Sequence, residues 1–274
     1  MRQRHVRGIE GKLAAYAGLI LHADEPESVG PACDKADGGA GYAVRWYQRG
    51  SGRYKLPEGF ARTYVEFGCG RGRFIGAMAE ADPEGLYIGV EGCKTIVLRA
   101  LEKTRAAELT NVRYIDAFIN DATGAFAENS VDGVFLNFSD PWPKDRHADR
   151  RLTAPKKAEA YLRILKPGGF VCFKTDGEAF FDYSLRTFTE AGFHIGPATR
   201  DLWHDQYCTI DDSKAGILMG AEAAEKMDGA SKGPQSAAKG DIITRAAATL
   251  TEYELRFRAI GQPIFHFAAT KNRT

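Results

Sequence analysis

The chain has 274 residues, enough for one large domain or two small ones, and its 44% hydrophobic and 27% charged residues predict a globular protein with a sizeable core. The net charge of +1 excludes general attraction to an acidic partner, so any such attraction must come from local clusters of basic residues. The five cysteines are odd in number and have no CxxC spacing, which argues against a disulfide scaffold or a zinc site, and no apolar run approaches the roughly 18 residues of a membrane span.

The N-terminal part of the chain, residues 1–62, is expected to be a basic arm with a mobile insertion. Its start, MRQRHVRGIEGKL, is basic but lacks the apolar stretch of a secretory signal. Residues 22–41 are rich in Gly, Ala, Pro and acidic residues and show no periodicity, which predicts a surface insertion. Together with the cysteine usage, these features favour a cytoplasmic protein.

From residue 63 onward, runs typical of strands alternate with runs typical of helices. The strand candidates are rich in β-branched and aromatic residues and cover residues 63–67, 86–90, 112–115, 131–138 and 170–175. The helix candidates cover residues 73–81, 95–109, 155–165 and 177–192. The KPGG sequence at 166–169 is expected to end the third helix before the next strand. Residues 211–240 are expected to form a second insertion, in which residues 217–227 could be a short helix. The alternation predicts an α/β domain with a doubly wound, mostly parallel sheet covered on both faces.

A glycine-rich turn joins the first strand to the first helix. VEFGCGRGRF carries Gly68, Gly70 and Gly72, which permit a tight turn and close backbone approach to a ligand. The spacing is G-x-G-x-G, whereas a dinucleotide site favours G-x-G-x-x-G. The preceding acid, Glu66, would repel a pyrophosphate and attract a cation. S-adenosylmethionine has no phosphate and carries an ammonium and a sulfonium, so the turn fits this cofactor better than a dinucleotide.

Three further acids follow the next three strands. Glu91 ends the second strand, where an acid can accept hydrogen bonds from ribose hydroxyls. Asp116 follows the third strand and could reach an adenine amino group, and Asp140 follows the fourth strand, at the reactive end of the cofactor. Each acid alone could be an ordinary residue at a strand end. Their succession at one edge of the sheet favours a cofactor site.

The sequence after Asp140 is stiff and then basic. Pro141 and Pro143 restrict the residues before them to extended conformations, so Asp140 should be held firmly; a rigid turn with Trp142 in the core would explain the prolines equally well. The basic residues of the following arm are Lys144, Arg146, His147, Arg150, Arg151, Lys156 and Lys157. Such a run is either a solvated face or a surface for nucleic-acid phosphates, and the neighbouring methyl-donor site favours nucleic acid.

These motifs together resemble the tRNA (guanine-N7-)-methyltransferase family, in its bacterial single-chain form. The resemblance rests on MRQRH, VEFGCGRGRF, YIGVE, NFSDPWPK-x-RH-x-x-RRLT, FKTD and TEYELRF-x-x-x-GQPI. It implies a Rossmann-like S-adenosylmethionine-dependent methyltransferase fold. It also implies transfer of methyl to N7 of guanine 46 in the variable loop of tRNA, with S-adenosylhomocysteine as product, by a monomer or homodimer without a metal or a membrane partner.

The resemblance also implies roles for individual residues. Cofactor binding falls on Glu66, Gly68, Gly70, Glu91, Asp116 and Asp140, and Asp140 is in addition the catalytic residue. Substrate binding falls on Lys144, Arg146, His147, Arg150, Arg151, Asp176, Thr251, Glu252, Tyr253 and Glu254. The methyltransferase domain then covers residues 63–274, interrupted by a flexible insertion at about 211–240. The two insertions leave the path of the RNA open.

Some of these residues have a structural alternative. Asp176 has the position of an N-cap for the helix that follows it, and Thr251 and Glu254 have the T-x-x-E spacing of a capping box. Tyr253 and Phe257 have the spacing of one helix face and are expected in the core. Capping and substrate contact do not exclude each other.

Three other functions are compatible with the sequence. The glycine turn and Glu91 would permit an NAD-dependent oxidoreductase, although the glycine spacing and Glu66 count against it. A relative that binds RNA without catalysis would keep the same motifs. A methyltransferase of another RNA, a protein or a small molecule would share the cofactor site, but a protein or small-molecule substrate would leave the basic arm without a purpose.

Overall fold

The computed structural model describes residues 8–22, 54–118, 123–204, 208–209, 217–218 and 239–273. The strands of the main sheet are β1 (Arg62–Phe67), β2 (Gly85–Glu91), β3 (Val112–Asp116), β4 (Val131–Asn137), β5 (Leu165–Thr175), β6 (His194–Thr199) and β9 (Phe265–Thr270). A separate pair consists of β7 (Cys208–Thr209) and β8 (Ile217–Leu218). The helices are α1 (Ile9–Ala14), α2 (Arg73–Ala81), α3 (Lys94–Ala106), α5 (Pro155–Ile164), α6 (Glu178–Glu190), α8 (Lys239–Ala248) and α9 (Glu252–Ala259), with short 3-10 helices η1 (Ala17–Leu19) and η2 (Asp145–Arg150).

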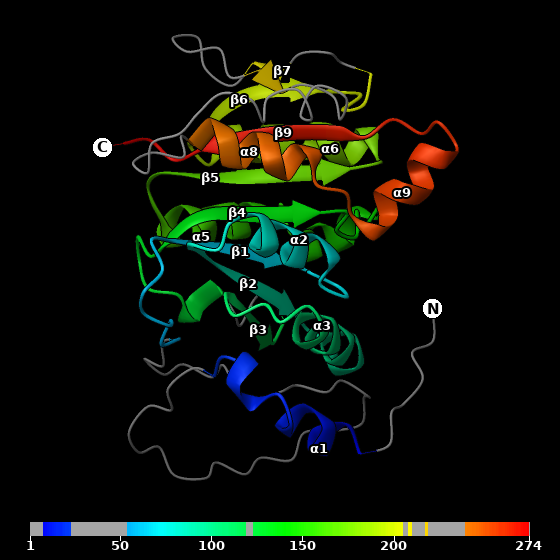
Figure 1. Cartoon of the computed structure of the whole chain (residues 1–274). Helices are drawn as coiled ribbons and strands as arrows, with labels where there is room; N and C mark the ends of the chain where they lie inside the picture. The colour runs from blue at the N-terminus through cyan, green and yellow to red at the C-terminus, as the bar shows by residue number, and fades with distance from the viewer. Residues whose placement is uncertain are drawn as a thin grey trace.

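The main sheet is mostly parallel and twisted (Figure 1). Among the described residues its strand order is β3-β2-β1-β4-β5-β9-β6. The pairs from β3 to β5 are parallel, whereas β9 is antiparallel to both of its neighbours, β5 and β6. The prediction of a doubly wound, mostly parallel sheet is confirmed. Neither β6 nor β9 was among the predicted strands.

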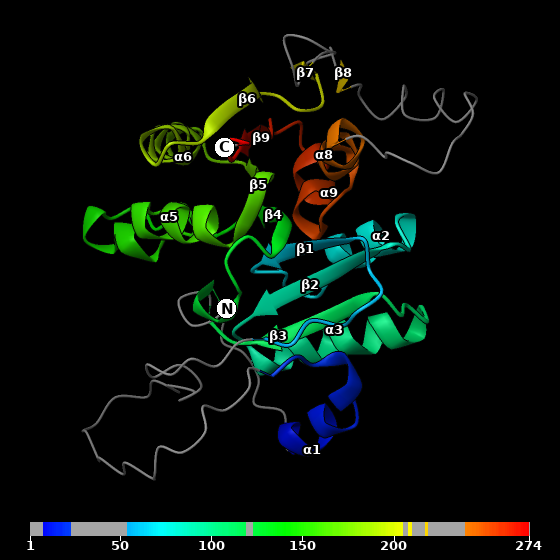
Figure 2. The same ribbon diagram turned by 90° about the vertical axis from the view of Figure 1, so that its left-hand side faces the viewer.

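Helices cover both faces of the sheet (Figure 2), as the alternation of elements predicts. The apolar residues of α5 and α6 belong to one buried cluster, and those of α2, α3 and α8 belong to another. Successive residues of β1 alternate between the two clusters, with Val65 and Phe67 in the first and Tyr64 in the second. Burial on both sides explains why the strands are continuously apolar rather than alternately polar.

The KPGG sequence does not lie where it was expected. The helix α5 ends at Ile164 and β5 begins at the next residue, so residues 166–169 lie inside the strand. The extra residues are accommodated by a break in register, because Val131 pairs with Leu165 whereas Gly133 pairs with Phe170. A bulge of this kind lets the strand carry Pro and Gly without losing its partner.

The described part of the N-terminal arm packs along the β3 edge of the sheet. The backbone N–H of Leu21 donates to the carbonyl of Tyr114 at 2.8 Å, and the Lys94 ammonium lies 2.7 Å from the Glu10 carboxylate. The division of the chain at residue 62 stays a prediction, and both proposed insertions lie almost entirely outside the described residues. Of the helix suggested at 217–227, only the first two residues are described, and they form β8.

Candidate functional site

Three of the predicted site acids lie on neighbouring parallel strands, at the carboxyl edge of the sheet. Glu66 is the next-to-last residue of β1, and Glu91 and Asp116 end β2 and β3 as direct partners across the sheet. Asp140 follows the end of β4, which pairs with β1. Because parallel strands end at the same edge, the fold gathers all four carboxylates on the side where ligands of open α/β sheets bind.

The glycine turn has the backbone conformation that only glycine adopts readily. The φ angles of Gly68, Gly70 and Gly72 are 77°, 55° and 71°, all in the left-handed region. The N–H of Gly70 donates to one Glu91 carboxylate oxygen at 3.2 Å, and the N–H of Cys93 donates to the other at 3.0 Å. Glu91 therefore holds the turn and the start of α3 together. A Cβ at Gly70 would meet nothing within 4 Å, so there is space beside this part of the turn.

Glu66 is the most unusual of the acids because it is only 2% exposed. Among the described residues, no Lys or Arg side chain is in hydrogen-bond contact with its carboxylate. Its Oε1 accepts a hydrogen bond from the Asn137 amide at 2.9 Å, whereas its buried Oε2 has no hydrogen-bond partner among the described residues. Burial raises the pKa of this carboxyl to about 8, although hydrogen bonds from the Asn137 amide and from the backbone of Ile75 oppose the shift. A cation bound near this carboxylate would favour its ionised form, so the site fits a positively charged ligand.

The second and third acids are also perturbed by burial. Burial is the main cause of the raised pKa of both Glu91 and Asp116. The Lys94 ammonium lies 3.9 Å from the Asp116 carboxylate and opposes the rise in the pKa of Asp116.

Next to Glu91 and Asp116 lies Phe118, an aromatic residue that the sequence motifs did not indicate. Its ring is 56% exposed and fills the space that a side chain at Gly92 would need. The only sequence signal for it is an apolar residue two positions after a strand-end acid.

The loop after β4 is strained around Asp140. Phe138 and Trp142 have φ angles of 50° and 40°, which are unfavourable for residues with a side chain. Asp140 itself is exposed. Trp142 is only partly buried, and its ring contacts His147 edge-on at 5.7 Å, so the alternative that places Trp142 in the core is wrong.

Arg151 supports this loop from inside the protein. It is 9% exposed, and its guanidinium donates to the carbonyls of Pro141 at 2.9 Å and Trp142 at 3.0 Å. The same guanidinium lies 4.2 Å above the ring of Tyr183. The sequence predicts that Arg151 contacts RNA, but its donors are directed at the protein, and we assign it to holding the Pro-Trp-Pro turn.

The other basic residues of the predicted arm differ in how far their side chains are exposed to solvent. Lys157, like Arg151, is buried, and His147 is half-buried. The exposed members are Lys144, Arg146, Arg150 and Lys156. Lys144, Arg146 and Arg150 lie beside or in η2, which follows Asp140, and Lys156 lies in the first turn of α5. We call these four residues the exposed basic arm.

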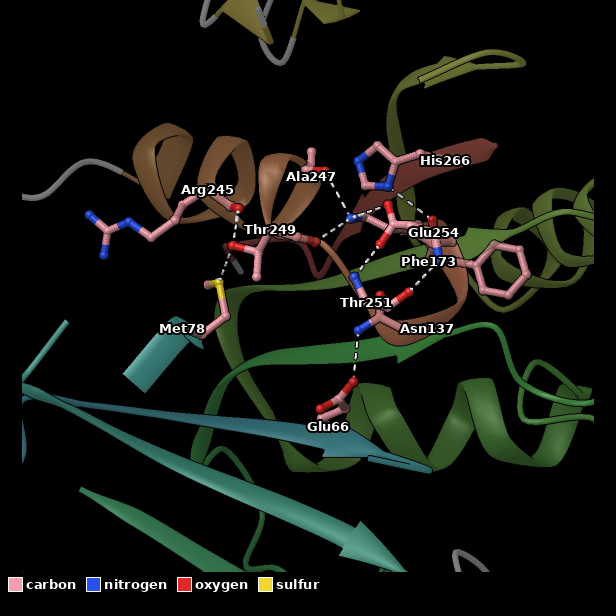
Figure 3. Close-up of polar contacts among 11 residues, drawn as sticks. Glu66, Met78, Asn137, Phe173, Arg245, Ala247, Thr249, Thr251, Glu254 and His266 are labelled. Carbon is pink, nitrogen blue, oxygen red and sulfur yellow. Dashed lines mark hydrogen bonds and ion pairs between the residues drawn. The ribbon is translucent and has the colours of Figure 1, made fainter. Parts of the chain in front are cut away.

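The TEYE motif begins α9, and its capping box is confirmed. The Glu254 carboxylate accepts a hydrogen bond from the N–H of Thr251 at 2.7 Å, and the Thr251 hydroxyl accepts one from the N–H of Glu254 at 3.1 Å (Figure 3). The other Glu254 oxygen lies 3.0 Å from the Lys174 ammonium. Glu254 has no exposed surface. Its predicted contact with the substrate base is therefore not available in this structure, because both oxygens are used inside the protein.

The rest of the motif is accessible. Tyr253 is 55% exposed, so the expectation that it lies in the core is wrong; its ring stacks on Phe138 instead. Glu252 lies 2.8 Å from the Lys103 ammonium and 3.9 Å from the Arg71 guanidinium. Beside this contact is a groove of about 460 Å³, lined by Arg71, Arg99, Glu102, Lys103 and Ala106.

Asp176 follows β5 at the same edge of the sheet. The helix α6 is capped by Gly177 without a side-chain hydrogen bond, so the alternative that makes Asp176 its N-cap is wrong. The Asp176 carboxylate accepts a long hydrogen bond of 3.4 Å from the Gln262 amide, and its side chain is half-buried. Asp176 therefore keeps acceptor capacity for a ligand.

The described residues contain neither a membrane-spanning helix nor a metal-binding group. None of the helices described is long and apolar enough to cross a bilayer. Over the same part of the chain, no three His, Cys, Asp or Glu side chains come together as metal ligands.

Comparison with known proteins connects these features to enzymes of one kind. A family model for putative methyltransferases matches residues 61–208. The chain is 34% identical to the tRNA (guanine-N(7)-)-methyltransferase of Lachnoclostridium phytofermentans, over 77% of this chain and 81% of that one. Against the Bacillus subtilis protein of the same name the identity is 33%, over 74% of this chain and 77% of the other.

A solved structure supports the fold. The crystal structure of the 16S rRNA methyltransferase KamB matches with a TM-score of 0.50 at 11% sequence identity, covering 78% of this chain and 89% of that one. A likeness at this identity concerns the fold alone. It confirms the Rossmann-like methyltransferase fold that the sequence predicted.

Proposed function

The chain belongs to the tRNA (guanine-N(7)-)-methyltransferase family, and from this membership we infer that it transfers a methyl group from S-adenosylmethionine to N7 of a guanine in tRNA. We propose guanine 46 of the variable loop as the target. The observation that carries the proposal is Glu66, a buried carboxylate with an oxygen that has no partner among the described residues, beside the glycine turn. A site of this kind attracts a cation and disfavours a pyrophosphate.

The described residues fit the cofactor. Glu66 would bind its ammonium group, Glu91 its ribose hydroxyls and Asp116 its adenine amino group. The backbone of Gly68 and Gly70 allows the ligand to approach closely. S-adenosylmethionine, when bound, supplies the methyl group that is transferred.

The contribution of the protein to the reaction is alignment and charge. Guanine N7 has an in-plane lone pair and no proton, so its methylation needs no general base. The protein must instead hold N7 in line with the methyl carbon and sulfur, and orientation of this kind is worth effective molarities of about 10⁵–10⁸ M. Methylation makes the purine cationic, and the Asp140 carboxylate, held by the turn that Arg151 supports, can stabilise the developing charge.

The tRNA would lie along the exposed basic arm. Its four residues Lys144, Arg146, Arg150 and Lys156 are solvent-exposed and come after Asp140 in the chain, so they suit phosphates near the target base. Asp176 would accept hydrogen bonds from the guanine edge, which presents donors that adenine lacks. A tRNA substrate agrees with the expected cytoplasmic location, and a monomer or homodimer stays a prediction.

Arg146→Ala is expected to weaken tRNA binding and to reduce the slope of log affinity against log salt concentration by about 1, because one phosphate contact is lost. The affinity for S-adenosylmethionine should not change. Binding isotherms at several salt concentrations test this. Arg186→Ala, an exposed arginine of α6 outside the basic arm, is the matched control and should leave the slope unaltered. Equal slopes for Arg146→Ala and the wild type would contradict the assignment.

Binding of S-adenosylmethionine is expected to release protons between about pH 6 and 8. The free protein holds a proton on Glu66, whose pKa is raised to about 8, and the ammonium of the ligand favours the ionised carboxylate. The affinity should therefore rise with pH up to about pH 8, above which the ligand loses the proton of its own ammonium group. Titration calorimetry in buffers of different ionisation enthalpy measures the protons directly, and Glu66→Gln should bind more weakly without releasing this proton. Proton release that Glu66→Gln leaves intact would assign the titration to another group.

The proposed function is tested by incubating the protein with radiolabelled S-adenosylmethionine and unmodified bulk tRNA. The labelled product is then cleaved chemically at N7-methylguanine, and the position of the cleavage is mapped. Label at guanine 46 is the expected result. Label at another guanine would correct the target position, and the absence of label despite cofactor binding would overturn the substrate.

A further inference from the structure

Three aromatic rings meet beside Asp140. Phe138 precedes that residue by two positions, and its ring lies 6.0 Å from Tyr253, nearly parallel at 25°. Phe257, one helical turn after Tyr253, lies 5.7 Å from Phe138 and 6.4 Å from Tyr253. The cluster therefore joins the loop after β4 to the helix α9.

Lys174 contacts both chain segments that contribute to this aromatic cluster. The carbonyl of Lys174 accepts a hydrogen bond from the N–H of Phe138 at 2.9 Å, and the Lys174 ammonium binds Glu254, the neighbour of Tyr253. Lys174 also donates to the carbonyls of Ala247 and Thr249, which precede α9. The rings are thus fixed to β5 rather than to two independent loops.

One ring of the cluster remains largely accessible. Tyr253 is 55% exposed, although Phe138 and Phe257 are both partly buried against Leu202, Ala247 and Ile264. An exposed ring with a rigid aromatic backing presents a flat, preorganised surface. The backbone of Phe138 is strained, with φ 50°, and Phe138 stands two residues before Asp140 in the same loop.

We propose that the exposed face of Tyr253, backed by Phe138 and Phe257, is the platform on which the target guanine stacks during methylation. The inference rests on the proposed function and adds the surface that receives the base. An aromatic face matches a purine ring in shape and size, and enzymes that act on bases of nucleic acids stack them on aromatic side chains. Such stacking does not distinguish guanine from adenine, so selectivity falls to hydrogen-bonding groups such as Asp176.

The chemistry gives the platform a second role. Methylation at N7 leaves the purine with a positive charge, and the electron-rich face of a tyrosine ring attracts cations. Stacking therefore becomes stronger as the reaction proceeds. Tyr253 would act on the charge from the face of the ring, whereas Asp140 would act on it from the edge.

The test combines three variants with two forms of tRNA. Tyr253→Leu removes the ring, Tyr253→Phe keeps it, and Leu255→Ala, an exposed apolar residue of the same helix outside the cluster, is the control. Each protein is measured for affinity towards tRNA carrying guanine 46 and towards the same tRNA with an abasic position 46. The affinity for S-adenosylmethionine and the melting temperature are measured in parallel.

We expect Tyr253→Leu to bind guanine-bearing tRNA about 10-fold more weakly and to methylate it with a kcat/KM lower by at least the same factor. Its affinity for abasic tRNA should equal that of the wild type, because the ring then has no base to stack on. Tyr253→Phe, which keeps the ring, should retain the preference for guanine-bearing over abasic tRNA, whereas Leu255→Ala should remain within about twofold of the wild type throughout.

Equal weakening towards both tRNAs, or no weakening at all, would overturn the platform. This comparison depends on binding alone, so it stands apart from the activity assay. A wild-type protein that prefers guanine-bearing over abasic tRNA through Tyr253 but transfers no methyl would retain the platform and refute the proposed function.

Discussion

Asp140→Asn is expected to lower turnover by about 100-fold while the affinity for S-adenosylmethionine changes only a few-fold. The amide keeps the shape of the side chain but loses the negative charge that faces the purine as it becomes cationic. Preorganised groups at a developing charge are typically worth about 10²–10³ in rate. Single-turnover methylation of tRNA at saturating cofactor and RNA measures the effect without contributions from binding or product release.

The matched control for this substitution is Asp145→Asn. Asp145 is an exposed carboxylate five residues further along the same loop, and it begins η2. Asp145→Asn changes the net charge of the protein by the same amount as Asp140→Asn but should leave turnover near that of the wild type. If Asp140→Asn turns over as fast as the wild type, Asp140 is not the catalytic residue and only the orientation of the base remains to explain the rate.

Lys174→Met is expected to destabilise the protein by about 3–5 kcal/mol, because it leaves the Glu254 carboxylate buried without its countercharge. The ammonium of Lys174 makes three contacts of 3.0 Å or less, to Glu254, Ala247 and Thr249, and neither charged side chain is more than 1% exposed. Urea unfolding gives the free energy directly. Activity on tRNA should fall as well, since α9 loses its attachment to β5.

Two comparisons separate the buried pair from a general effect of charge. Lys103→Met breaks the exposed contact with Glu252 and should cost less than about 1 kcal/mol. The double variant Lys174→Met/Glu254→Gln removes both charges and should be more stable than Lys174→Met alone, because no unpaired carboxylate is left in the interior. A double variant less stable than Lys174→Met would show that the capping box, rather than the ion pair, dominates the energy.

The strand-end acids could be predicted from the sequence because each comes at the end of an apolar run whose residues, by themselves, indicate a strand. In a parallel sheet every such run ends at the same edge, so Glu66, Glu91, Asp116 and Asp140 converge without any knowledge of long-range contacts. The capping box of Thr251 and Glu254 is equally local and was equally readable.

The burial of charged residues could not be predicted in this way. Glu254 and Lys174 are 80 residues apart in the chain, and nothing in either neighbourhood indicates that the two side chains meet. Arg151 belongs to a run of basic residues that reads as one surface, yet its guanidinium turns inward to the Pro-Trp-Pro turn. Exposure is a property of the packed structure, and a sequence pattern shows only which charges are available.

The position of β9 has a consequence for how the protein is made. Within the described residues β6 pairs in the main sheet only with β9, which reaches it from far downstream in the chain. On the ribosome, β1 to β5 can assemble as they emerge, whereas β6 must wait without a partner beside the open edge of β5. An unpaired strand next to an open edge invites association between nascent chains. The interval before β9 arrives is therefore the period in which unpaired strand edges of the main sheet are most exposed to such association.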